Sequence, residues 1–116
     1  NCAEAILSAA NDYYGLGLDD KTIKAIAPFG GGFYLEKTCG FVSGGLAAIG
    51  VMFATDEIPY ANPKVIEMAQ TWVKAFEERF GDTECKVLKD QWFCRELGFE
   101  VADLFESVVG SQYSSK

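Results

Sequence analysis

The chain has 116 residues, of which 10 are basic and 17 acidic, and its net charge of −7 argues against binding to nucleic acid or to anionic membranes. Hydrophobic residues make up 49% of the sequence, enough for a single domain with a substantial core over residues 1–116. Together with 12 glycines, this content indicates a well-buried helix, an oligomer interface such as that of a homodimer, or both.

The N-terminal part predicts two helices followed by an irregular loop. Asn1 and Glu4 have the spacing of a capping box, so we expect a helix that begins at Cys2 and ends near Gly15. Its apolar face is predicted to carry Cys2, Ile6, Ala9 and Tyr13. Asp19 or Asp20 caps a short second helix to about Ala27, with Ile23 and Ile26 turned inward. The glycine-rich stretch 28–33 is expected to be irregular.

A third helix is predicted from Cys39 to about Ala54. Gly40, Gly44 and Ala48 recur every four residues along it and form a smooth face that another backbone can approach closely. The run 38–55 has no charged residue, but its many small and polar residues favour a buried central helix over a membrane span.

The C-terminal half predicts two further helices. After a linker from Pro59 to Pro63, one helix begins at Pro63 and ends before Gly81. Its apolar stripe consists of Val65, Met68, Trp72, Phe76 and Phe80. The last helix is expected from about Gln91 to Val109 with an inward-facing Cys94, and a disordered polar tail from about residue 110. One side of this helix is predicted to carry Phe93, Leu97, Val101, Leu104 and Val108, and Cys94 shares a face with Val101 and Phe105. The predicted fold is all-α, a compact bundle of about five helices around a central glycine-rich helix.

The chain contains four cysteines and no histidine. Cys2, Cys39 and Cys85 follow residues that commonly cap helices, so each thiol is expected in a first helical turn. Free backbone N–H groups and the helix dipole favour a thiolate there. We therefore predict that Cys39 is the most acidic thiol and the nucleophile, with Cys2 within about 7 Å between Cα atoms. The alternative is that the cysteines are small buried hydrophobic residues, above all Cys94.

The order of motifs along the chain resembles the redox-active four-cysteine family with the CGAxxG signature. The likeness rests on residues 1–7, Phe29-Gly-Gly-Gly32, Cys39-Gly-Phe-Val-Ser-Gly44, Cys85-x-x-Leu88 and Cys94. Phe41 stands where the signature has alanine, and the interval from Cys85 to Cys94 is shorter than the family leads us to expect. The resemblance implies a small helical protein with cysteine-based redox or iron–sulfur chemistry.

Several chemistries stay open for these four cysteines. We expect Cys2, Cys39, Cys85 and Cys94 to gather at one end of the bundle, with Cys39 and Cys2 as catalytic thiols. Two of them could cycle between dithiol and disulfide with a redox partner protein, or all four could hold an iron–sulfur cluster. A non-catalytic module with an all-cysteine zinc site, or two structural disulfides, is the alternative. Nothing in the sequence indicates an oxidising compartment, so we expect a cytoplasmic location.

Overall fold

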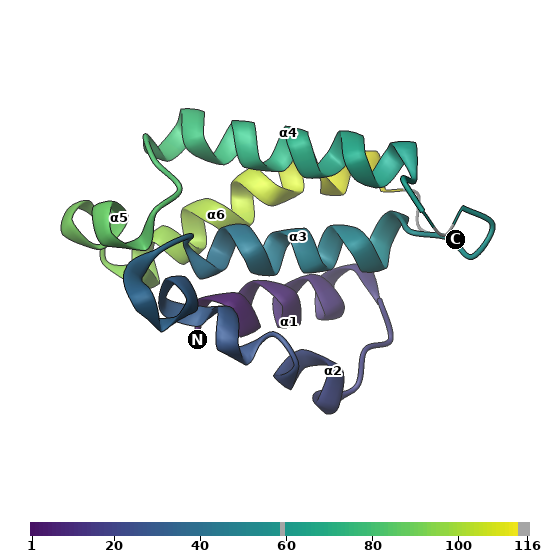
Figure 1. Cartoon of the computed structure of the whole chain (residues 1–116), viewed down its shortest axis with the longest axis horizontal. Helices are drawn as coiled ribbons and strands as arrows, with labels where there is room; N and C mark the ends of the chain where they lie inside the picture. The colour runs from purple at the N-terminus through teal and green to yellow at the C-terminus, as the bar shows by residue number, and fades with distance from the viewer. Residues whose placement is uncertain (59, 114–116) are drawn as a thin grey trace.

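The computed structural model describes residues 1–58 and 60–113, and within them the chain is an all-α bundle (Figure 1). Its α-helices are α1 (Cys2–Tyr14), α2 (Asp20–Lys24), α3 (Gly40–Phe53), α4 (Pro63–Phe80), α5 (Cys85–Gln91) and α6 (Cys94–Val108). Three short helical turns of other types are labelled η1 (Ala27–Phe29), η2 (Gly32–Glu36) and η3 (Gly110–Gln112). The predicted all-α fold is confirmed, although these residues form six α-helices and not about five. None of the described helices is both long and apolar enough to cross a bilayer.

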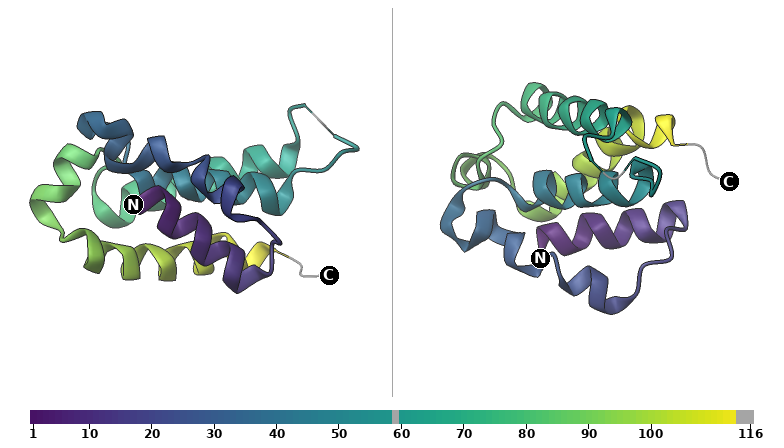
Figure 2. Two further views of the ribbon diagram at one scale, coloured as in Figure 1. Left: turned by 90° about the horizontal axis from the view of Figure 1, so that it is seen from below. Right: turned by 45° about the vertical axis from the view of Figure 1, so that its right-hand side comes forward.

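The central helix is α3, with α1 packed on one side and α4 on the other (Figures 1 and 2). Most of its residues are buried, as its uniformly apolar sequence predicts. Its glycine face lies against α1: a Cβ atom at Gly44 would lie 2.5 Å from the carbonyl oxygen of Ala3 and 2.5 Å from Cγ2 of Ile6. Only a glycine permits this approach of the two backbones, which agrees with the predicted role of that face.

The boundaries and the buried stripe of α4 agree with the prediction. Asn62 caps its first turn by accepting from the backbone N–H of Lys64 at 2.9 Å, and Gly81 ends it in the left-handed conformation. The stripe is anchored by the indole N–H of Trp72, which donates to the carbonyl of Val42 on α3 at 3.2 Å. The buried residues of α4 are Met68, Trp72, Phe76 and Phe80. This contact fixes the middle of α4 against the first turn of α3.

The apolar face of α1 is rotated from the prediction by about one residue. Ala9 and Tyr13 are exposed, Tyr13 to 73%, whereas Ala3, Leu7 and Ala10 are buried. The reason is the partner surface: α1 packs on the smooth face of α3 through Ala3 and Ile6, which lie against Gly44. Ala9 and Tyr13 are left facing outward.

The predicted last helix is divided in two. Trp92 and Phe93 have extended backbones, so α5 ends at Gln91 and α6 begins at Cys94. The ring of Trp92 packs edge-on against Phe80 of α4 at 5.6 Å between centroids, which an uninterrupted helix would not allow. Phe93, expected on the buried face, is 77% exposed. The expected mid-helix position of Cys94 is therefore wrong, because this residue starts a helix.

The glycine-rich segment forms an unusual turn. Gly31, Gly32, Phe33 and Tyr34 all have positive φ between 55° and 64°, a left-handed conformation that non-glycine residues adopt at a cost of about 1–2 kcal/mol each. The helix expected to reach Ala27 ends at Lys24.

At the C-terminal end, Gly110–Gln112 form η3, where a disordered tail was expected. Tyr113 packs edge-on against the rings of Tyr14 and Phe53, so the order of the chain continues past α6. Pro59 of the expected linker and residues 114–116 of the expected tail lie outside the described residues.

Candidate active site

All four cysteines lie at helix starts. Cys2, Cys85 and Cys94 are the first residues of α1, α5 and α6, and Cys39 is the N-cap of α3. These helices begin at the same end of the bundle (Figure 1). The four cysteines line one cavity of about 50 Å³, together with Gly31, Gly40, Phe41, Leu88, Lys89, Trp92 and Leu97. The fold thus brings together thiols that are separated by as many as 92 residues of sequence.

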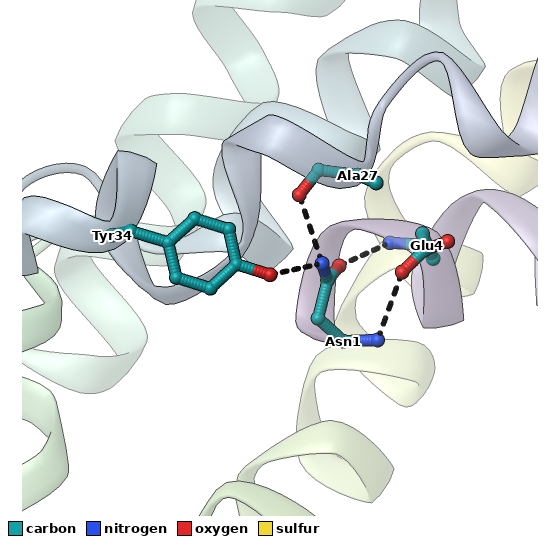
Figure 3. Close-up of polar contacts among 4 residues, drawn as sticks. All are labelled: Asn1, Glu4, Ala27 and Tyr34. Carbon is teal, nitrogen blue, oxygen red and sulfur yellow. Dashed lines mark hydrogen bonds and ion pairs between the residues drawn. The ribbon is translucent and has the colours of Figure 1, made fainter.

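The start of α1 is positioned by Asn1. Its side-chain oxygen accepts from the backbone N–H of Glu4 at 3.0 Å, and the Glu4 carboxylate accepts from the backbone nitrogen of Asn1 at 3.2 Å, the predicted capping box (Figure 3). The side-chain amide of Asn1 also donates to the carbonyl of Ala27 at 2.9 Å and to the hydroxyl of Tyr34 at 3.1 Å. One residue therefore caps α1 beside Cys2 and ties it to the left-handed turn.

Cys39 and Cys85 are placed side by side by backbone pairing. Thr38 and Glu84 form an isolated antiparallel bridge. The N–H of Cys39 donates to the carbonyl of Thr83 at 2.7 Å, and the N–H of Cys85 donates to the carbonyl of Lys37 at 2.6 Å. The two cysteines enter their helices directly from this bridge, so their separation is set by main-chain hydrogen bonds.

Gly40 allows Cys2 to approach the start of α3. A Cβ atom at position 40 would lie 3.1 Å from Cβ of Cys2 and 2.9 Å from the backbone nitrogen of Ala3. Gly30 is similarly close to the side chain of Asn1. The sequence-based idea that glycines let these backbones crowd together agrees with this geometry. The predicted Cα separation of Cys2 and Cys39 stays a prediction.

Burial dominates the acid–base behaviour of the inner thiols. Cys39 is only 5% exposed, and burial raises its pKa to about 12, although the backbone N–H groups of Phe41 and Val42 favour the thiolate. Burial, followed by the proximity of Cys94 and Cys85, raises the pKa of Cys2 to about 11. Burial also raises the pKa of Cys85. The expectation that Cys39 is the most acidic thiol is therefore wrong, because the cost of desolvation exceeds the benefit of the helix start.

Accessibility distinguishes the fourth cysteine. Cys94 is exposed, whereas Cys39 is buried and Cys2 and Cys85 are partly buried. The sequence-based expectation of an inward-facing Cys94 is thus also corrected: it lines the cavity from its solvent side. Among the four, Cys94 is the thiol that a large reactant can reach.

Two lining residues were not identified from the sequence. Lys89 lies four residues after Cys85, so a helix that starts at Cys85 puts both side chains on one face, and that spacing is the signal that could have found it. Its ammonium pairs with the carboxylate of Glu36. Trp92 was missed because its position depends on the break between α5 and α6.

Phe41 is buried and lines the cavity. Its ring reaches α6 opposite Gly98, where a Cβ atom would lie 3.2 Å from Cζ of Phe41. The glycine at position 98 leaves room for the larger side chain.

A metal centre requires several donor side chains that converge on one point. All four cysteines are free thiols. Over residues 1–58 and 60–113, no three cysteine, aspartate or glutamate side chains are arranged to hold a metal ion. The number of sulfur ligands suits an iron–sulfur cluster or a zinc site, but this arrangement of the side chains does not fit one.

A known protein family matches the chain over residues 1–108. The matching family is described as "Putative redox-active protein (C_GCAxxG_C_C)". The chain belongs to this family. Its description names cysteines as the shared feature, and the four cysteines of this chain lie within the matched residues. No curated protein and no solved structure matches the chain.

Proposed function

We propose that this protein is a thiol–disulfide redox protein in which Cys94 exchanges with the disulfide of a partner polypeptide and Cys2 completes the exchange. The observation that supports it best is the common cavity, which four thiols line and of which only Cys94 is exposed. Cys2 is assigned as the second thiol because it lines the same cavity and, after burial, the proximity of Cys94 contributes to its raised pKa. This assignment keeps Cys2 as a reacting thiol and replaces Cys39 by Cys94 as the nucleophile.

The exchange has two steps. The sulfur of Cys94, as thiolate, attacks one sulfur of the partner's disulfide; a bond forms between Cys94 and that sulfur, and the partner's other sulfur leaves as a thiolate. The sulfur of Cys2 then attacks Cys94 and displaces the partner's remaining sulfur. The partner has gained two electrons and two protons, and this protein has become a Cys2–Cys94 disulfide. The reverse sequence oxidises a dithiol partner.

The buried thiols do not compete with Cys94 in the first step. Burial keeps Cys39 and Cys2 protonated at neutral pH, so neither competes with Cys94 for solvent-borne disulfides. Cys39 and Cys85, held together by the bridge between Thr38 and Glu84, would provide a second dithiol in the same cavity. It could reduce the Cys2–Cys94 disulfide internally by the same exchange.

Disulfide mapping tests the proposal. Reduced protein would be equilibrated with oxidised glutathione and its peptides analysed by mass spectrometry; we expect a transient mixed disulfide at Cys94 and a final Cys2–Cys94 disulfide. Cys94→Ser should abolish the mixed disulfide, whereas Cys39→Ser, the matched control, should retain it. Equal mixed-disulfide yields in the two variants would overturn the assignment.

The same preparation distinguishes the remaining candidates. Anaerobically purified protein would be examined by visible absorption and metal analysis. Charge-transfer bands with stoichiometric iron would replace the proposal by cluster-based electron transfer, and colourless protein with stoichiometric zinc would replace it by a structural site. Metal-free, colourless protein with four titratable thiols is the result that the proposal requires.

A further inference from the structure

We infer that a groove between α1 and α6 receives a basic, amphipathic polypeptide segment of the redox partner. The groove has a volume of about 600 Å³ and is lined only by residues of these two helices. The inference rests on the proposed function only in identifying the bound segment with the redox partner; binding itself does not require the thiols.

The floor of the groove is apolar and contoured by small side chains. Ala9 of α1 and Ala102 of α6 are exposed and line it, together with the buried residues Ile6 and Phe105. The aromatic ring of Tyr13, 73% exposed, stands beside them. Apolar side chains of a bound segment would displace water from this floor, and the two alanines leave room for them.

The rim of the groove is acidic. Asp12, Asp103 and Glu106 line it, and no lysine or arginine does. Neither Asp12 nor Asp103 forms an ion pair with another described residue. A second copy of this chain, related by twofold symmetry, would place these carboxylates against themselves. Lysine or arginine side chains complement the rim, and they can also stack on Tyr13.

The groove leads to the reactive end of the molecule. α1 and α6 lie side by side (Figure 2) and both start at the cysteine cavity. On α1 the groove begins at Ile6, about 6 Å along the helix from Cys2, and on α6 Ala102 lies about 12 Å from Cys94. A segment bound in the groove would reach the one exposed thiol by continuing about 12 Å along α6 beyond Ala102.

Binding of a designed probe to the whole chain tests the inference. The probe is a fluorescein-labelled amphipathic peptide of leucine and lysine, and its control has every lysine replaced by glutamate. We expect measurable binding of the lysine peptide by fluorescence anisotropy, weakening with salt, and none of the glutamate peptide. Asp103→Lys should weaken binding about fivefold to tenfold, and Ala102→Trp should block the groove.

Matched variants separate the alternatives. Glu78→Lys on α4 changes the net charge as Asp103→Lys does but lies outside the groove, so binding should change less than about twofold. Equal losses in both variants, or equal binding of both peptides, would overturn the inference. A dimer that Ala102→Trp converts to monomer in sedimentation experiments would overturn it in favour of a second copy. Cys94→Ser should bind the peptide unchanged, so failure of the redox chemistry alone is distinguishable.

Discussion

Glu36 and Lys89 form an ion pair that connects η2 to α5 beside the cysteine cavity. Lys89 lines the cavity and lowers the pKa of Cys85, while Glu36 acts in the opposite direction. The pair therefore reduces the influence that the ammonium alone would have on the Cys85 thiol.

The first prediction follows from this pair. Lys89→Met should raise the pKa of Cys85, because the stabilising cation is removed, and Glu36→Gln should lower it, because the opposing anion is removed. The measurement is the rate of alkylation of Cys85 against pH, followed by mass spectrometry. Lys86→Met, which removes an exposed lysine of the same helix outside the cavity, is the control. Shifts in the same direction for Lys89→Met and Glu36→Gln would refute the electrostatic explanation.

The second prediction concerns the order of thiol reactivity. In reduced, folded protein at neutral pH, Cys94 should be alkylated first and Cys39 last, because Cys94 is exposed whereas burial raises the pKa of Cys39 to about 12. We expect the alkylation rates of Cys94 and Cys39 to differ by more than about tenfold, because Cys39 reacts only when the structure around it opens locally. In concentrated urea the four rates should become similar. Fast labelling of Cys39 in the folded protein would contradict its burial.

The third prediction uses two glycines of α3. Gly44→Ala should destabilise the protein by about 1–3 kcal/mol, because its Cβ would overlap the backbone of Ala3. Helix propensity alone would favour alanine at this position by about 1 kcal/mol. Gly50→Ala is the matched control: nothing lies within 4 Å of a Cβ there, so it should stabilise by up to about 1 kcal/mol. The unfolding free energies of both variants would be measured in urea. Equal changes in the two variants would mean that α1 does not pack on Gly44.

The fourth prediction concerns alkaline stability. The folded pKa values of Cys2 and Cys39 are about 11 and 12, above the unfolded value of about 8.5. The unfolded chain therefore loses these protons at a lower pH than the folded chain does. The stabilisation that the two buried thiols contribute is fully present below about pH 8.5 and is lost as the pH rises toward 11–12. Comparing urea unfolding of reduced wild type and Cys39→Ala at pH 7.5 and pH 10 isolates the effect from other groups. The decrease in unfolding free energy should be smaller in Cys39→Ala; an equal decrease would exclude Cys39 as its source.

Local signals in the sequence predicted those parts of the fold that neighbouring residues determine. The Asn1–Glu4 capping box, the stripe of α4 and the smooth face around Gly44 were all read from spacing and are all present. Each depends on helical periodicity or on a capping side chain, which do not require knowledge of the partner.

The predictions that were wrong concern features that residues distant in the sequence determine. The break before Cys94 depends on the packing of Trp92 against Phe80, and the buried face of α1 depends on which residues of α3 are glycine. The acidity of Cys39 was misjudged because its position at a helix start is visible in the sequence, whereas its desolvation is not. Lys89 was missed because it joins the site only once α5 exists.

The left-handed turn has a consequence for how the molecule unfolds. Phe33 and Tyr34 keep their unfavourable backbone angles only while contacts hold them, among them the hydrogen bond from Asn1 to the Tyr34 hydroxyl. Detachment of the start of α1 removes that bond. Relaxation of the turn to ordinary backbone angles then lowers its free energy. The first turn of α1 and residues 31–36 should therefore open as one cooperative unit, exchanging their amide hydrogens together and becoming cleavable by proteases at the same denaturant concentration. Because Cys2 lies in that unit, partial unfolding would expose a second thiol before the rest of the bundle melts.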